Sequence, residues 1–168
     1  DCRSVSPVSL IVSAFSRVAD VRQTLTPELK HRDGSAIWLV DLGGGERRLG
    51  GSVLAQVHAQ MGDVAPDLDD PAAFRRALEW LAAEKRAGRI HAWHDRSDGG
   101  LIVAALEMAF AARLGLELDL GQDSTPLATL FNEELGVLGE VADADAAAFC
   151  ASAQASGARV QRVGRASA

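Results

Sequence analysis

Runs of apolar residues near the start of the chain predict two strands. Residues 10–18 (LIVSAFSRV) and 36–42 (AIWLVDL) are rich in β-branched and other apolar side chains, which is typical of strands. The dipeptides Thr26-Pro27 and Asp33-Gly34 lie between them and favour turns. We therefore expect two consecutive strands before the first helix.

Helical spacing of apolar residues begins after a glycine-rich stretch. Over residues 53–61, one stripe of a helix would carry Val53, Leu54, Val57 and Met61. This spacing predicts a first helix over residues 53–61.

A second helix has clear start and stop signals. Asp70 is suited to the N-cap, Pro71 to the first helical position and Gly88 to the position after the C-cap. The apolar positions that we expect on its buried face are Phe74, Leu78, Leu81 and Ala82.

The rest of the chain alternates short apolar runs with helical ones. Gly115 ends one predicted helix, and Asp143 and Gly157 bound the other. The strands are expected at residues 90–93, 116–120, 135–141 and 159–163, and the helices at residues 101–114 and 144–156. This order predicts a layered α/β or α+β domain rather than a helix bundle or a β-sandwich.

Composition and charge narrow the class of protein. The chain has 168 residues, of which 48% are hydrophobic, enough for one domain with a core, and no apolar run approaches the roughly 18 residues that span a bilayer. A net charge of −6 without a basic stripe argues against a nucleic-acid partner. Cys2 and Cys150 form no metal-binding spacing or disulfide framework, and no signal peptide is recognisable. We expect a cytoplasmic protein without a membrane or nucleic-acid partner.

The segment HDRSDGG, residues 94–100, is the first candidate site. It lies between a predicted strand and a helix, where ligands collect in α/β sheets because helix N-terminal N–H groups are free. Asp95 and Asp98 are hard oxygen ligands suited to Mg²⁺, and Ser97 can donate to a phosphate. The alternative is a glycine turn in which Asp98 only caps the helix, and for this motif alone we favour that interpretation.

Two further segments leave their roles open. The glycine-rich residues 43–52 can cradle an anion beside Arg47 or Arg48, or can form a flexible loop and helix cap. Glu133 and Glu134 can bind a cation or transfer protons, but we favour solvated charges or local salt bridges.

The histidines and Cys150 do not suggest a metal centre. His91 and His94 flank a predicted strand at odd spacing and should point to opposite faces. We expect His31 and His58 at the surface and Cys150 packed in a helix.

Taken together, the segments resemble a known family. SPVSLIVSAFSRVADVRQTLTPEL, IWLVDLGGGERRLGGSVLAQV, HAWHDRSDGGLIVAALEMAFA and LFNEELG occur in this order. They look like the large, single-chain phosphoribosylformylglycinamidine synthases, a ligase and glutamine amidotransferase family of purine biosynthesis. The similarity is to the second C-terminal-type half of the synthetase region, which belongs to the aminoimidazole ribonucleotide synthetase superfamily.

The resemblance implies a fold and a reaction. The fold would be an α+β, three-layer α/β sandwich, partly ferredoxin-like, with a mixed sheet. The reaction would use ATP to activate formylglycinamide ribonucleotide and ammonia from glutamine to form the amidine. Asp95 matches a Mg²⁺ ligand of the family and Ser97 matches a residue that contacts the nucleotide. The site would be the auxiliary one, where ATP or ADP is structural, and no residue of this chain would be catalytic.

The resemblance also implies missing parts. We expect residues 1–35 to be a strand and turn that enter from the preceding half, and residues 36–168 to be a C-terminal-type domain truncated at its end, with an open sheet edge. Its partners would be the N-terminal-type half, which supplies the other metal ligands, and the glutaminase domain. The chain should be inactive alone. The alternative is a purely structural half without ligand contacts; the details LGGSVLAQV and FNEELG argue against a selenophosphate- or thiamine-phosphate-kinase type of enzyme.

Overall fold

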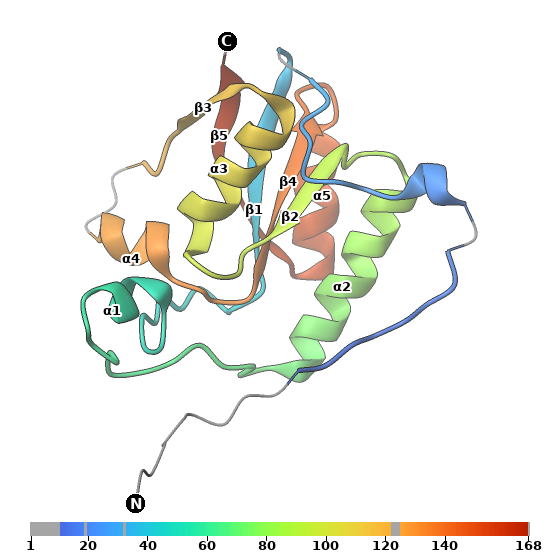
Figure 1. Ribbon diagram of the computed structural model, residues 1–168. Coiled ribbons are helices and arrows are strands. Elements are labelled where there is room, and N and C mark those ends of the chain that lie inside the picture. Colours follow the sequence, from blue (N-terminus) through green and yellow to red (C-terminus); the bar gives the residue numbers. More distant parts are fainter. Residues whose placement is uncertain (1–10, 19, 32, 122–124, 168) are drawn as a thin grey trace, which may run out of the picture.

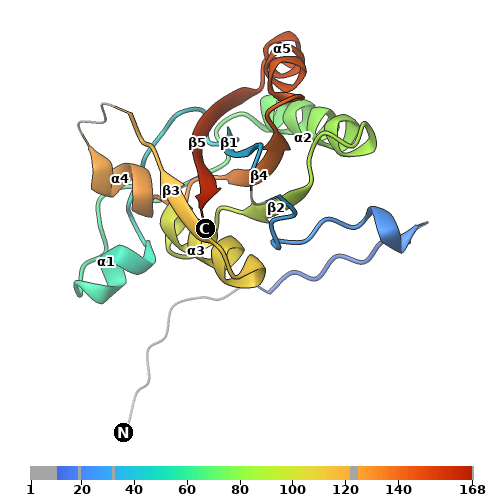
Figure 2. The same ribbon diagram turned by 90° about the horizontal axis from the view of Figure 1, so that it is seen from above.

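A five-stranded sheet forms the centre of the molecule. The computed structural model describes residues 11–18, 20–31, 33–121 and 125–167. The strands lie in the order β2-β4-β1-β5-β3, with α3 on one face and α2 and α5 on the other (Figures 1 and 2). The strands are β1 (Ser35–Asp41), β2 (Ala92–Asp95), β3 (Gly115–Leu118), β4 (Gly136–Ala142) and β5 (Arg159–Ser167). The α+β three-layer class is confirmed.

All four strand pairings are antiparallel, whereas a mixed sheet was expected. The helical connections from β1 to β2 and from β2 to β3 each join two strands that run in the same direction but are not neighbours in the sheet. β1 and β2 are such a pair, and β4 lies between them. β5 fills the equivalent gap between β1 and β3. Parallel strands are thus never neighbours, although the chain alternates strands and helices.

The sheet separates two hydrophobic cores. The helix α3 (Gly100–Ala112) packs on a face that includes Ile37, Leu39 and Leu138. The helices α2 (Pro71–Arg86) and α5 (Ala146–Ser156) pack on the opposite face. Side chains alternate along a strand, so β1 contributes to both cores and is buried over nearly its whole length.

The predicted boundaries of α2 are confirmed. The Asp70 carboxylate accepts hydrogen bonds from the N–H groups of Ala72 and Ala73, and Pro71 is the first helical residue. Gly88 follows the C-cap with a φ of +73°. The buried face differs from the expected one: Leu81 is buried, Phe74 and Ala82 are half-buried, and Leu78 is 43% exposed. The buried residues of the helix are Ala77, Trp80, Leu81 and Glu84.

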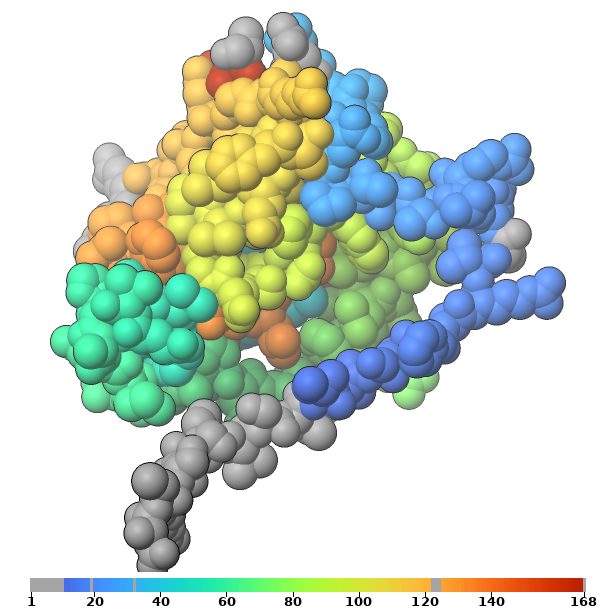
Figure 3. Space-filling view, in the orientation of Figure 1, coloured from blue at the N-terminus to red at the C-terminus, as the bar shows by residue number. Residues whose placement is uncertain are grey.

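The N-terminal segment does not form the predicted strand. Residues 11–18 have no regular secondary structure, pair with no strand of the sheet and expose their large side chains. Figure 3 shows this stretch, in blue, extending along the side of the folded body. Position 10 lies outside the described residues. A short 3₁₀ turn, Val21–Gln23, follows.

Other elements are shifted or shortened. The first helix, α1 (Val53–Val57), ends before Met61, and Val57 and Met61 are exposed, so the predicted stripe is not a buried face. β2 begins two residues later than expected. Asp145, not Asp143, precedes α5 and makes no side-chain cap. A short helix, α4 (Pro126–Phe131), was not predicted. None of the helices is long and apolar enough to cross a bilayer, among the residues described.

Candidate functional site

The loop between β2 and α3 presents a polar outer side. Asp95 ends β2, and its side chain is 75% exposed. Ser97 and Asp98 are also exposed, whereas Arg96 between them is buried. The two residues that we expected to contact metal and nucleotide, Asp95 and Ser97, therefore both lie at the solvent side of one loop.

Arg96 anchors the loop from beneath. Its Nε donates to the Glu134 carbonyl oxygen at 2.7 Å, and its Nη2 donates to the Leu135 carbonyl oxygen at 3.0 Å and to Asp41 Oδ1 at 3.3 Å. Burial lowers the pKa of Arg96, and this effect exceeds the opposing one of the nearby Asp41 carboxylate. The loop is thus held in place by the end of β1 and the start of β4.

The start of α3 is not free to bind a phosphate at Gly99. The Gly99 N–H donates to Glu133 Oε1 at 2.9 Å. Gly99 is also the N-cap, with a φ of +82°, so Asp98 does not serve as the expected cap. A Cβ on Gly100, whose φ is +72°, would lie 2.7 Å from the Asn132 carbonyl oxygen. Packing therefore explains this glycine without any ligand.

Glu133 joins this loop to the glycine-rich segment. The same Oε1 atom accepts a hydrogen bond from the Val53 N–H, at the start of α1, at 2.8 Å. One carboxylate thus fixes the beginnings of two helices that are far apart in the sequence. A negative charge at helix N-termini is favourable, which explains an acid at this position. This role of Glu133 was not predicted, and the only signal for it in the sequence is the position of FNEELG beside a turn.

Glu134 is fully buried, which corrects the expectation of a solvated charge for this residue. Arg48 donates to it from Nε at 2.6 Å, from Nη2 at 2.8 Å and from its backbone N–H at 3.0 Å. Burial alone would raise the pKa of Glu134, but the hydrogen bonds and charge of Arg48 together lower it. Glu134 does form a salt bridge, but it is buried and joins residues 86 positions apart, whereas a local one was expected.

The glycine-rich residues 43–52 form a fixed loop and a helix cap. Ser52 is buried, and its Oγ accepts a hydrogen bond from the Ala55 N–H at 3.2 Å as the N-cap of α1. A Cβ on Gly43 would lie 2.9 Å from Glu134 Cβ, and one on Gly50 would collide with the Val64 backbone. Of the two interpretations left open, the cap is confirmed for Ser52.

A hollow of about 370 Å³ lies beside Asp95. His94 Nε2 lies 2.7 Å from a carboxylate oxygen of Glu107, and His94 Nδ1 is 3.4 Å from Asp95 Oδ1. In the described part of the chain, no three metal-ligating side chains gather at one point. A metal at Asp95 would therefore complete its coordination with other kinds of ligand, such as water or phosphate oxygens. The hollow is lined by Leu25, Pro27, Trp93, His94, Asp95 and Val137.

Within the described ranges, the remaining histidines and Cys150 belong to no group of three metal-ligating side chains. His31 and His58 are exposed as expected, and the His31 and His91 rings make an edge contact with centroids 4.7 Å apart. Cys150 is a free thiol in α5 that packs against the core beneath this helix.

The chain matches a known protein family over most of its length. Residues 32–168 match the model of the family described as AIR synthase related protein, C-terminal domain. The chain belongs to this family. The match covers the whole sheet, the β2–α3 loop and, apart from Leu29, the buried residues of both cores.

Solved structures show the same fold. Thermotoga maritima PurL complexed with ATP matches with a TM-score of 0.66 and 17% identity, over 88% of this chain and 24% of that chain. The same protein complexed with FGAR matches with a TM-score of 0.66 and 17% identity, over 88% of this chain and 26% of that chain. Thiamine-monophosphate kinase from Stenotrophomonas maltophilia matches with a TM-score of 0.57 and 18% identity, over 86% of this chain and 51% of that chain. The chain thus spans about a quarter of the PurL chains that it matches.

Proposed function

We propose that this chain contributes one half of a Mg²⁺–nucleotide site in a phosphoribosylformylglycinamidine synthase. Asp95 would supply a carboxylate to the metal and Ser97 a hydroxyl to the nucleotide. The observation that supports this is the β2–α3 loop, which is anchored by buried Arg96 while Asp95 and Ser97 face solvent.

The chemistry of the loop fits this role. Mg²⁺ takes hard oxygen ligands, keeps several waters and is usually held by one or two protein carboxylates plus phosphate oxygens. Asp95 is such a ligand, and it borders a hollow with apolar walls. A metal there would neutralise phosphate charge, while this chain would orient the nucleotide and shield one side of it from water.

The wider assignment rests on the family and on the named relatives. PurL has been solved with ATP, with ADP and with FGAR, which supports a nucleotide-using ligase of purine biosynthesis. We propose that residues 36–168 form the C-terminal-type domain and residues 1–35 lead into it from a preceding half. The rest of the synthase, including a glutaminase domain, would supply the catalytic residues, and this chain alone would be inactive. The whole enzyme would lie in the cytoplasm.

The nucleotide content of a polypeptide with both synthetase halves tests the proposal. Asp95→Ala should reduce the co-purified nucleotide and Mg²⁺, measured by chromatography and elemental analysis. Asp63→Ala is the control, because it removes an exposed carboxylate outside this loop. Unchanged nucleotide after Asp95→Ala, or equal loss in both variants, would exclude Asp95 as the ligand.

One observation favours the second candidate, a purely structural half. Glu133 already satisfies the Gly99 N–H, so the loop is stable without a ligand. This alternative predicts that ADP and Mg²⁺ leave the Tm of the two-half polypeptide unchanged. A bound nucleotide would instead raise it, because ligand binding to the folded state adds stability.

A further inference from the structure

The side chain of His94 connects α3 to the end of β2. Its Nε2 lies 2.7 Å from a carboxylate oxygen of Glu107, in α3, and its Nδ1 lies 3.4 Å from Asp95 Oδ1. Nδ1 also donates to the Asp95 carbonyl oxygen at 2.8 Å, because a carbonyl oxygen can only accept. The His94 side chain is 15% exposed, whereas those of Glu107 and Asp95 are 53% and 75% exposed. A largely buried imidazole thus joins two exposed carboxylates.

Asp95 is the last residue of an edge strand. Among the described strands β2 pairs with β4 alone, and Val137 is the partner of Asp95 in that register. A strand with a neighbour on one side only has a row of backbone groups that the sheet does not hold. The direction in which the Asp95 side chain leaves the strand therefore depends on contacts made by the residues beside it.

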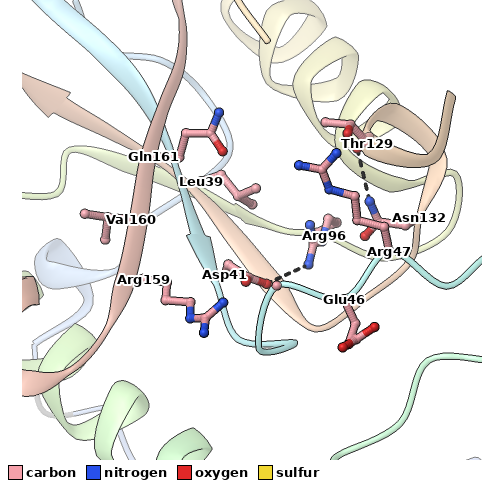
Figure 4. A pocket seen from close by; sticks show the side chains of 11 residues that line it. Leu39, Asp41, Glu46, Arg47, Arg96, Thr129, Asn132, Arg159, Val160 and Gln161 are labelled. Carbon is pink, nitrogen blue, oxygen red and sulfur yellow. Dashed lines mark hydrogen bonds and ion pairs between the residues drawn. The ribbon is translucent and has the colours of Figure 1, made fainter. Parts of the chain in front are cut away.

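Both residues beside Asp95 are anchored to the folded body. Arg96 donates to Asp41 at the end of β1, and both line a hollow of about 350 Å³ on the inner side of the loop (Figure 4). His94 is held by Glu107, which lies next to fully buried Met108 in a helix that packs on the sheet. The backbone of Asp95 is thus fixed on both sides while its carboxylate stays exposed.

We propose that His94 is a positioning residue for Asp95: it orients this carboxylate toward a divalent cation, and Glu107 fixes the plane of the imidazole. This inference rests on the proposed role of Asp95 and adds to it two residues that do not touch the metal. Groups that hydrogen-bond to a metal ligand fix its orientation, and their loss typically weakens metal binding by about 10- to 100-fold.

The alternative is that His94 only ties α3 to β2 and contributes to stability. The two ring nitrogens separate these roles, because Nδ1 faces Asp95 and Nε2 faces Glu107. An asparagine side chain places its amide nitrogen near the position of Nδ1, and a glutamine side chain places its own near that of Nε2. His94→Asn therefore keeps a donor for Asp95, whereas His94→Gln keeps one for Glu107.

Titration of the polypeptide with both synthetase halves tests the proposal, with Mn²⁺ as a paramagnetic substitute for Mg²⁺, ADP present and binding followed by electron paramagnetic resonance. His94→Gln should weaken Mn²⁺ binding by about tenfold and His94→Asn by less than about threefold. In the Asp95→Ala background, His94→Gln should cause no further loss, because a positioning residue acts only through the ligand that it orients. His58→Gln makes the same chemical change at an exposed histidine and should leave Kd within about twofold.

The outcomes distinguish this proposal from the proposed function. Unchanged binding in His94→Gln, together with a clear loss in Asp95→Ala, would overturn the role of His94 and leave Asp95 as the ligand. Unchanged binding in Asp95→Ala would overturn both. Equal weakening in His94→Asn and His94→Gln, or losses that add in the double variant, would show that His94 is only a structural link. Circular dichroism checks that each variant folds; Glu107→Ala, which frees the ring without removing it, replaces His94→Gln if that variant does not.

Discussion

At the residue scale, the molecule depends on buried charges that connect distant segments. Glu134 and Arg48 are joined by two side-chain hydrogen bonds and a backbone one. The sequence shows that two acids follow Phe131 and Asn132, but not which of them is buried. Burial of Glu134 depends on Arg48 being folded against it from 86 positions away, which no local pattern encodes.

Replacement of Glu134 tests this pair. Glu134→Gln leaves the Arg48 guanidinium without its buried counter-ion, and we expect a loss of about 2–3 kcal/mol in the free energy of unfolding at pH 7. Asp69 remains as a partner of Arg48 and limits the loss. Urea denaturation measures it, and Glu79→Gln, which removes an exposed pair with Arg75, should cost less than about 0.5 kcal/mol.

The same pair sets the pH dependence. The pKa of Glu134 is lower in the folded protein than its ordinary value of 4.5, so the stabilisation is present above pH 4.5 and is lost as pH falls through the lowered pKa. The stability difference between wild type and Glu134→Gln should therefore shrink on acidification below that value. A difference that stays constant from pH 7 to pH 3 would contradict the assignment.

At the element scale, boundaries with local chemistry were predictable and those set by tertiary contacts were not. Asp70, Pro71 and Gly88 fix the ends of α2 through backbone geometry, and their positions followed from the sequence. The end of α1 and the unpaired residues 11–18 could not be predicted in this way. Both segments have apolar patterns typical of regular secondary structure. In the described chain, however, no surface buries all the apolar residues of either segment.

The Asp70 cap gives a quantitative test of α2. Asp70→Ala removes the acceptor for two backbone N–H groups, and we expect it to lower stability by about 1 kcal/mol. Thermal and urea unfolding measure this change. Asp63→Ala is the control, since Asp63 is an exposed acid in the loop before the helix. A comparable loss in the control would attribute the effect to net charge rather than to capping.

At the scale of the whole molecule, the α+β class was predictable but the strand order was not. The alternation of strands and helices indicated layers, and the resemblance through HDRSDGG and FNEELG indicated the family. The order β2-β4-β1-β5-β3 arises because β4 and β5 pair on either side of β1. These two strands follow the crossovers from β1 to β2 and from β2 to β3 in the chain, so they insert between strands that precede them. Asp95 ends β2 and Ser97 lies in the loop that follows, and the binding of metal and nucleotide by these two residues stays a prediction.

The shared strands β1 and β4 imply that both cores unfold together. Leu138 is fully buried in the core beneath α3, whereas Trp38 and Trp80 lie in the core on the other side of the sheet. Leu138→Ala should lower the free energy of unfolding by about 3 kcal/mol, as expected for a cavity in a packed core.

If the sheet couples the cores, tryptophan fluorescence and far-UV circular dichroism should report the same lowered urea midpoint. Leu127→Ala, at a position 61% exposed, should shift it little. Separate midpoints for the two probes would instead mean that the cores unfold independently, because the tryptophans would then report a core that Leu138→Ala leaves intact.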